Sequence, residues 1–176
     1  MKWHVHSERE LYRDRWVDLR CADVELDDGR RLDHRFINVQ AGAGAVVLND
    51  HDEVLLIWRH RFITNAWNYE IPMGAIEPAE APIAAAARET EEETGWRPGP
   101  LRFLMYDEPM NGLLNTCNHI YLAETADHIG SPSEGFESDH VAWVPLAKLP
   151  DLIRDRQIVG GTTIAALLMA AREHGV

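Results

Sequence analysis

Cysteine is scarce in this sequence: only Cys21 and Cys117 occur among 176 residues, and the two stand far apart. They have no metal-ligand spacing, which indicates a reducing compartment. A long hydrophobic run is also missing, since none approaches the roughly 20 residues that cross a bilayer. The first sixteen residues are too charged for a signal peptide. We therefore expect a cytoplasmic protein without a membrane partner.

Basic residues are also few, with 17 lysines and arginines against 29 acidic residues, a net charge of −12. This balance argues against binding of a nucleic-acid polymer, which needs a basic footprint. A small phosphorylated substrate stays open, because a metal ion can invert the local potential. The nine histidines show no HExxH-type spacing, so we expect surface or structural roles for them.

The length and a hydrophobic content of 45% suit a globular protein with a sizeable core. Residues from about 11 to 40 alternate as strands do, with a turn at 27–29, and predict an antiparallel ribbon. We assign 1–40 to this ribbon, within the same domain as 41–176. Apolar runs at 42–48 and 53–59 predict a buried hairpin. Further strands are expected at 101–106, 119–123 and 140–144, and a last helix at 162–173.

The most informative segment runs from Gly74 to Trp96 and reads GAIEPAEAPIAAAARETEEETGW. At about 100° per residue on a helix, three glutamates fall within an arc of roughly 100°, and Glu91 points about 160° away from the first of them. These three are Glu89, Glu92 and Glu93. A narrow stripe beside them is expected to pack on the core, and it consists of Ile83, Ala86, Ala87, Thr90 and Thr94.

Three carboxylates held this close repel one another unless a cation neutralises them. Oxygen-only ligands favour a hard divalent ion such as magnesium or manganese. The alternative is an ordinary solvated acidic face, which predicts basic partners four residues away. Arg88 is the only basic residue from Glu70 to Thr94, against seven acidic ones. The sequence therefore favours a metal site.

This segment resembles the Nudix box, Gly-x5-Glu-x7-Arg-Glu-U-x-Glu-Glu-x-Gly-U, where U is a bulky apolar residue. Thr90 is a smaller choice at the first U, and Trp96 fills the last. The fixed positions are matched by Gly74, Glu80, Arg88, Glu89, Glu92, Glu93 and Gly95. The resemblance implies a magnesium-dependent hydrolase of nucleoside diphosphates linked to another group. It also implies an α/β fold, the Nudix-type α/β/α sandwich with a mixed central sheet.

The resemblance suggests roles for the box residues. Glu89, Glu92 and Glu93 are expected to hold the metal, and the backbone carbonyl of Met73 completes their set. Glu89 and Arg88 also belong to the predicted catalytic group, with Arg88 holding a neighbouring carboxylate in orientation. Two readings fit Glu80, hydrogen bonding to the loop that enters the helix or a charge favoured by the helix dipole.

A general base is expected in the acidic loop GSPSEGFESDHVAW, which could close over the site. Its candidates are Glu134, Glu137 and Asp139. Glu137 is preferred because it stands six residues before Trp143, where ADP-ribose-type members of the family tend to carry a functional glutamate. An ordinary solvated loop is the other interpretation of the same residues.

Within the Nudix group the chain most resembles the ADP-ribose pyrophosphatase and nucleoside-diphosphate-sugar branch. The resemblance includes LLIWRHRF, the stretch Glu70-Ile71-Pro72-x-Gly74 and WVPL at 143–146. The predicted substrate contacts are Arg61 with Arg59 for a phosphate or ribose, Glu70 for the adenine amino group, and Trp67 or Tyr69 for stacking on a base. The alternatives are a surface salt bridge for Arg61 and simple burial for the aromatic residues. In this branch the N-terminal ribbon commonly completes a dimer, so a homodimer is expected.

Two departures from the branch leave the substrate open. The usual Ser-Pro-Gly stretch is replaced by DEPMNG at 107–112, and the acidic residue expected a few positions later falls at Asn115-Thr116. The leading hypothesis is hydrolysis of ADP-ribose or a related sugar nucleotide into two monophosphates. The alternatives are a house-cleaning pyrophosphatase of nucleoside triphosphates and a nucleotide-sugar-sensing domain without catalysis.

Overall fold

The computed structural model describes residues 2–133 and 139–175. By contact density the chain divides into two compact units. The first contains residues 1–41 and 108–117, and the second contains 42–107 and 118–176. The first unit therefore contains the expected ribbon of 1–40 together with a segment from the middle of the chain. Among the described residues, no helix is long and apolar enough to cross a membrane.

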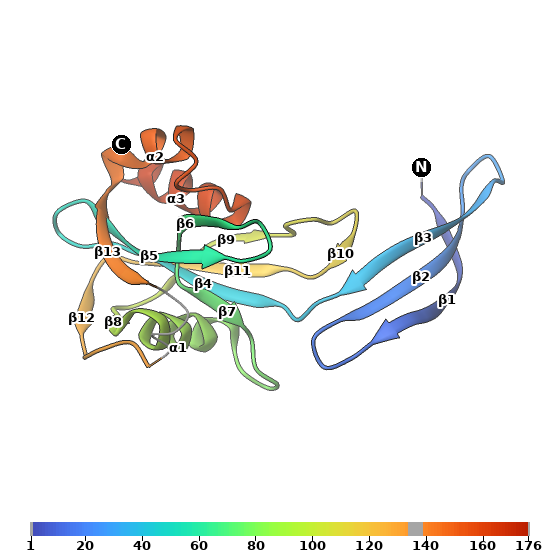
Figure 1. Cartoon of the computed structure of the whole chain (residues 1–176), viewed down its shortest axis with the longest axis horizontal. Coiled ribbons are helices and arrows are strands. Elements are labelled where there is room, and N and C mark those ends of the chain that lie inside the picture. The colour runs from blue at the N-terminus through green and yellow to red at the C-terminus, as the bar shows by residue number, and fades with distance from the viewer. Residues whose placement is uncertain (1, 134–138, 176) are drawn as a thin grey trace. The chain divides into compact units, whose positions relative to one another are not determined.

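The first unit is a sheet with the strand order β1-β2-β3-β10 (Figure 1). The strands are β1 (His4–Arg13), β2 (Asp18–Glu25), β3 (Arg31–Asn38) and β10 (Leu114–Asn115). The first three pair antiparallel, and β10 runs parallel to β3. Gly29 turns the β2–β3 hairpin with φ of 81°. The predicted ribbon is confirmed, but β1 begins earlier than residue 11. The sequence did not predict this start, because the side chains of β1 are all exposed and show no apolar alternation.

The second unit is built on mixed and antiparallel sheets. One sheet has the order β7-β4-β11-β9, in which β4 and β11 are parallel, and another has the order β13-β5-β6. A short pair, β8 and β12, lies beside them. The strands are β4 (Gly42–Val47), β5 (Glu53–Arg61), β6 (Ala66–Glu70), β7 (Met73–Ala75), β8 (Trp96–Pro98), β9 (Arg102–Asp107), β11 (Asn118–Ala123), β12 (Ala126–His128) and β13 (His140–Pro145).

Helices cover this unit on both sides, as Figure 1 shows: α1 on one side, α2 and α3 on the other. Their bounds are α1 (Pro82–Thr94), η1 (Leu146–Lys148), α2 (Leu149–Arg154) and α3 (Gly161–Glu173). The main apolar core packs the inner face of the sheets against η1, α2 and α3. A smaller cluster lies under α1 and contains Ala43, Ala85, Ala86 and Tyr121.

The predicted hairpin of 42–48 and 53–59 is wrong as a pairing, although both strands exist. β4 lies between β7 and β11, and β5 lies between β6 and β13. Within the described residues the two strands are linked by the single bridge of Leu48 with Val54. The physical reason is that both runs are apolar on both faces, as central strands are. Such a pattern predicts burial but does not say which strand is the neighbour.

The expected packing stripe of α1 also needs correction. The buried residues of the helix are Ala85, Ala86, Glu89, Thr90, Glu93 and Thr94. Ile83, placed in the stripe by its apolar character, is instead 42% exposed. The helix is therefore rotated so that two of the three carboxylates lie on its buried side. Burying them is possible because partners for both carboxylates come from elsewhere in the unit.

Gly95 ends α1 in the left-handed conformation, with φ of 73°, and its N–H donates to the Glu91 carbonyl at 2.9 Å. A Cβ at this position would lie 2.1 Å from the Gly130 carbonyl oxygen. The predicted helix stop is therefore also a close contact between the end of α1 and residue 130.

We predict that Gly95→Ala lowers the free energy of unfolding by about 2 kcal/mol, because it combines left-handed strain with a backbone clash. Urea unfolding followed by circular dichroism measures this loss. Gly112→Ala is the control, since no described atom lies within 4 Å of its added Cβ. Equal losses in the two variants would contradict the prediction.

Candidate active site

The site begins where β7 passes under α1. Gly74 on β7 pairs with Ala43 of β4, and the carboxylate of Glu89 lies directly over the Gly74 backbone. A Cβ on Gly74 would come within 2.3 Å of the Glu89 carboxyl carbon. No side chain can occupy that space without displacing the carboxylate. The glycine of the box is thus required by the close approach of Glu89 to the chain.

Arg88 connects the loop before α1 with the acidic side of the helix. Its Nη1 donates to Glu89 Oε1 at 2.7 Å and to Glu92 Oε2 at 2.9 Å. Its Nε and Nη2 donate to the two oxygens of Glu80, both at 2.9 Å, and Nη2 also reaches the Ala75 carbonyl at 3.0 Å. One guanidinium therefore orients three carboxylates, the positioning role that the sequence predicted for one of them.

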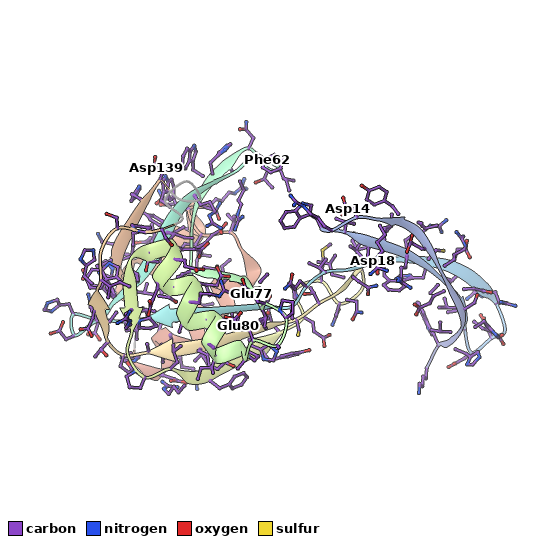
Figure 2. The ribbon with its side chains drawn as sticks, turned by 90° about the horizontal axis from the view of Figure 1, so that it is seen from below. Asp14, Asp18, Phe62, Glu77, Glu80 and Asp139 are labelled. Carbon is purple, nitrogen blue, oxygen red and sulfur yellow. The ribbon has the colours of Figure 1, made fainter. Side chains whose placement is uncertain are left out.

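Glu80 fixes the loop that enters α1, and Figure 2 shows Glu77 and Glu80 beside this helix. The Glu77 N–H donates to Glu80 Oε2 at 2.9 Å, which is the loop contact expected from the sequence. The hydrogen bonds from Arg88, followed by the one from Glu77, lower the pKa of Glu80 to about 2. Glu80 is therefore ionised at neutral pH and forms a bidentate ion pair with Arg88.

Glu93 is the most deeply placed carboxylate of the helix. Glu93 is 2% exposed, and its partner Arg59, on β5, is 5% exposed. Arg59 Nη2 donates to Glu93 Oε1 at 2.5 Å, and the Met73 N–H donates to Glu93 Oε2 at 2.9 Å. Burial raises the pKa of Glu93 to about 7, against the lowering effect of Arg59. Both oxygens of this carboxylate are thus held by donors from β5 and β7.

The sequence prediction placed Arg59 with the substrate contacts and did not identify this ion pair. Arg59 and Glu93 are 34 residues apart, so no helical or strand spacing connects them. One signal was available: Arg59 follows Leu55 and Ile57 at alternate positions, which places it on a buried face of a central strand. A buried arginine there requires an acidic partner.

These residues fit a hard divalent cation. The oxygens that these side chains offer to a metal are all carboxylate oxygens, and Nη1 of Arg88 donates to both Glu89 and Glu92. One positive charge can therefore satisfy both carboxylates. Within 2–133 and 139–175, no three histidine, cysteine or acidic side chains are arranged to hold a metal ion. The carboxylates of Glu89 and Glu93 instead accept hydrogen bonds from the guanidinium groups of Arg88 and Arg59. Magnesium binding, and a part for the Met73 carbonyl, stay predictions.

Two of the predicted substrate contacts lie close to each other. Arg61, at the end of β5, donates from Nε to Glu70 Oε1 on β6 at 2.9 Å, and a second bond joins Nη2 to the other oxygen. Arg61 alternates with Arg59, so both lie on the face of the sheet that meets α1. Its side chain is 50% exposed. The structure therefore brings Arg61 and Glu70 to the same face as the box.

Trp67 and Tyr69 are not brought to that face. Trp67 stacks on Trp58 at a centroid distance of 6.2 Å and 14° between planes, and Tyr69 contacts Trp58 at 4.5 Å. Trp58 alternates with Arg59 along β5, so these rings occupy the opposite face of the sheet. Trp67 and Glu70 are three residues apart on β6, and this odd spacing places their side chains on opposite faces.

Of the three candidates for the general base, Asp139 alone lies within the described residues. Glu134 and Glu137 lie outside the described residues. Asp139 is described, and Figure 2 labels it. Its carboxylate lies 3.2 Å from His140 Nδ1, its side chain is 61% exposed, and its N–H donates to the Trp58 carbonyl. The assignment of Glu137 as base stays a prediction.

The raised pKa of Glu93 predicts how the metal-free protein responds to pH. The folded state takes up a proton at about pH 7, above the ordinary value of 4.5, so Glu93 stabilises the fold below 4.5 and this stability is lost as pH rises through 7. The pKa of Glu80 is lowered to about 2, so the stability that Glu80 contributes is lost only as the pH falls from 4.5 toward 2.

We therefore expect Glu93→Gln to reduce the loss of unfolding free energy between about pH 5 and 8. Urea unfolding in a chelator at several pH values measures it. Glu91→Gln is the control, because Glu91 lies on the same helix in an exposed pair with Arg97. The histidines titrate in both variants, so only the difference between them counts. Identical pH profiles would contradict the assignment.

Comparison with known proteins finds two family matches. Residues 38–162 match the NUDIX domain family, and residues 3–38 match the nucleoside diphosphate sugar hydrolase N-terminal domain. A CMP-5'-(N-acetyl-N-hydroxy-3-aminopropyl)phosphonate hydrolase of Streptomyces rubellomurinus is 38% identical over 95% of this chain and 82% of its own length. An ADP-ribose pyrophosphatase of Bacillus subtilis is 24% identical over 92% of this chain and 88% of its own.

A crystal structure of an ADP compounds hydrolase superposes with a TM-score of 0.85 at 22% identity, covering 99% of this chain and 94% of the other. This likeness confirms the predicted fold class. The NUDIX match spans the box carboxylates and the strands that hold them. The chain belongs to the Nudix family of hydrolases.

Proposed function

We propose that this chain catalyses the magnesium-dependent hydrolysis of the pyrophosphate bond of ADP-ribose or a related nucleoside diphosphate-sugar. The observation that carries the proposal is the convergence of Glu89 and Glu92 on Nη1 of Arg88, on the same helix as Glu93. The matches to the NUDIX domain and to the nucleoside diphosphate sugar hydrolase N-terminal domain support it.

The reaction adds water across the bridge between two phosphorus atoms. The water oxygen bonds to one phosphorus, the bridging oxygen leaves with the other, and two monophosphates result. A bound magnesium or manganese ion would neutralise the developing charge and activate the water. In the proposal Glu89, Glu92 and Glu93 hold the ion, Arg88 keeps two of these carboxylates in orientation, and Glu137 takes the released proton.

Arg61 and Glu70 are the proposed substrate contacts on the α1 face. Arg61 is half exposed and has a bidentate partner in Glu70, so its guanidinium is held in a fixed plane. A phosphate or ribose hydroxyl can share this guanidinium, and Glu70 can accept from an adenine amino group. Trp67 lies on the opposite face, and the proposal gives it no contact with the substrate.

A second candidate substrate follows from the Streptomyces relative, whose name describes hydrolysis of a CMP-linked phosphonate. Such a substrate also joins a nucleotide phosphorus to a second phosphorus through a bridging oxygen. The same carboxylates and the same displacement would serve it. The difference lies in the groups on either side of the bridge, so a substrate screen needs both classes.

We predict that purified protein with magnesium releases two monophosphates from one of these substrates, and that Glu93→Gln lowers kcat at least about 100-fold while the protein stays folded. The screen covers ADP-ribose, sugar nucleotides, a CMP-phosphonate and deoxynucleoside triphosphates, with phosphatase coupling. Glu91→Gln, on the same helix, is the control and should keep its rate.

Other results identify the alternatives. Inorganic pyrophosphate from triphosphates, with no action on sugar nucleotides, would indicate the house-cleaning pyrophosphatase. Tight binding of a sugar nucleotide without products would indicate a sensing domain. Full turnover by Glu93→Gln would refute the ligand assignment.

We also infer a homodimer formed through the N-terminal ribbon. β1 lies at the end of its sheet, and all ten of its residues are exposed. Large apolar side chains are exposed in and next to it, among them Trp3, Val5 and Leu11. An open edge strand with apolar side chains is commonly covered by another chain.

Light scattering after size exclusion should therefore give about twice the chain mass of 20.0 kDa. Removing residues 2–13 should shift the protein to the monomer mass. A monomer mass for the full chain would contradict the inference.

A further inference from the structure

The buried ion pair of Arg59 and Glu93 involves a proposed metal ligand, because Glu93 is one of the three carboxylates proposed to hold the ion. Arg59 extends from β5, which is paired on both sides by β6 and β13. Glu93 extends from the last turn of α1. A rigid central strand therefore presents a fixed positive charge to one oxygen of the carboxylate, and the Met73 N–H takes the other.

Such a pair is held together by the cost of separating it. A carboxylate that is 2% exposed cannot be solvated by bulk water, and it is stable as an ion only with a partner close by. Removal of one partner leaves the other charge buried and uncompensated, which is far more destabilising than loss of an exposed pair. The state of Glu93 before a metal arrives therefore depends on Arg59.

The other two carboxylates of the turn have a different partner. Glu89 and Glu92 share the Nη1 of Arg88, which is anchored to Glu80 on the loop. Arg88 is part of the box, whereas Arg59 comes from β5, outside the motif and 34 residues before Glu93. The chain thus supplies a separate cation for the one carboxylate that Arg88 does not contact in these bonds.

We propose that Arg59 is a positioning residue that acts as the counter-ion of Glu93 in the metal-free protein, so that an arriving divalent cation meets a carboxylate already in place. The inference rests on the proposed function, since it takes Glu93 as a metal ligand. A bound cation then takes over part of the compensation that Arg59 provides alone. Metal ion and Arg59 should therefore substitute for each other in stabilising the fold.

The test compares the thermal unfolding of three proteins in a chelator and in saturating magnesium at about pH 8. The variant is Arg59→Met, which keeps most of the side-chain length and removes the charge. The matched control is Arg97→Met, which makes the same exchange in an exposed pair with Glu91 of the same helix. Calorimetric titration of magnesium into each protein gives the affinity independently of turnover.

We expect Arg59→Met to lower the metal-free Tm by roughly 10 °C and Arg97→Met by no more than about 2 °C. Magnesium should raise the Tm of Arg59→Met by more than it raises that of the wild type or the control. Arg59→Lys, which restores a charge without the planar fork, should lie between. Equal magnesium-induced shifts in all proteins would overturn the proposal.

If Arg59→Met does not fold without metal, the double variant Arg59→Met/Glu93→Gln decides. It removes both charges, so it should recover the metal-free fold; failure to recover would overturn the proposal. If magnesium raises the Tm of Arg59→Met most, but the wild type shows no magnesium-dependent hydrolysis, the proposed function is refuted and the counter-ion role is supported. If the wild type hydrolyses the substrate but magnesium raises the Tm of all proteins equally, only the counter-ion role is refuted.

Discussion

The structure depends on how negative charge is compensated on one turn of a helix. Glu89, Glu92 and Glu93 would repel one another on a solvated helix, and two of them are buried. Two arginines make the arrangement stable: Arg88 from the same helix and Arg59 from a neighbouring strand. The glycine on β7 and the strand β5 are constrained by the same requirement, because one must leave room for a carboxylate and the other must bring a cation to it.

The sheet of β13, β5 and β6 places the charged and the aromatic side chains on opposite faces. Alternation along β5 places Arg59 and Arg61 toward α1 and places Trp58 on the other face. β6 repeats the division, with Glu70 on the α1 face and Trp67 and Tyr69 on the aromatic face. Charged and aromatic residues that are mixed in the sequence are thus separated by the sheet. The proposed phosphate chemistry belongs to the face that carries the arginines.

Local patterns in the sequence predicted local features well. The box, the helix end at Gly95 and the loop contact of Glu80 depend on residues within about one or two turns, and their spacing is fixed by helix geometry. The rotation of α1 was not predicted, because the apolar character of Ile83 was given more weight than the carboxylates. Glu93 is buried only because Arg59 is present, and that contact spans 34 residues.

The same limit explains the strands. β4 and β5 are apolar on both faces, so their pattern predicts burial and leaves their neighbours undetermined. The position of Trp67 is a different case. The alternation that separates it from Glu70 is visible in the sequence, but which face meets α1 becomes known only when Arg59 is seen to contact Glu93. This long-range ion pair therefore identifies the face of the sheet of β13, β5 and β6 that meets α1.

The charges of the assembled site support the metal ion of the proposed function. Five carboxylates, those of Glu70, Glu80, Glu89, Glu92 and Glu93, face three guanidinium groups, those of Arg59, Arg61 and Arg88. Each of these arginines already has a carboxylate partner, and with every carboxylate ionised the set keeps two negative charges. A pyrophosphate would add more negative charge to the same face. In the proposed function, a divalent cation between the carboxylates and the phosphates would supply the additional positive charge that such a substrate requires.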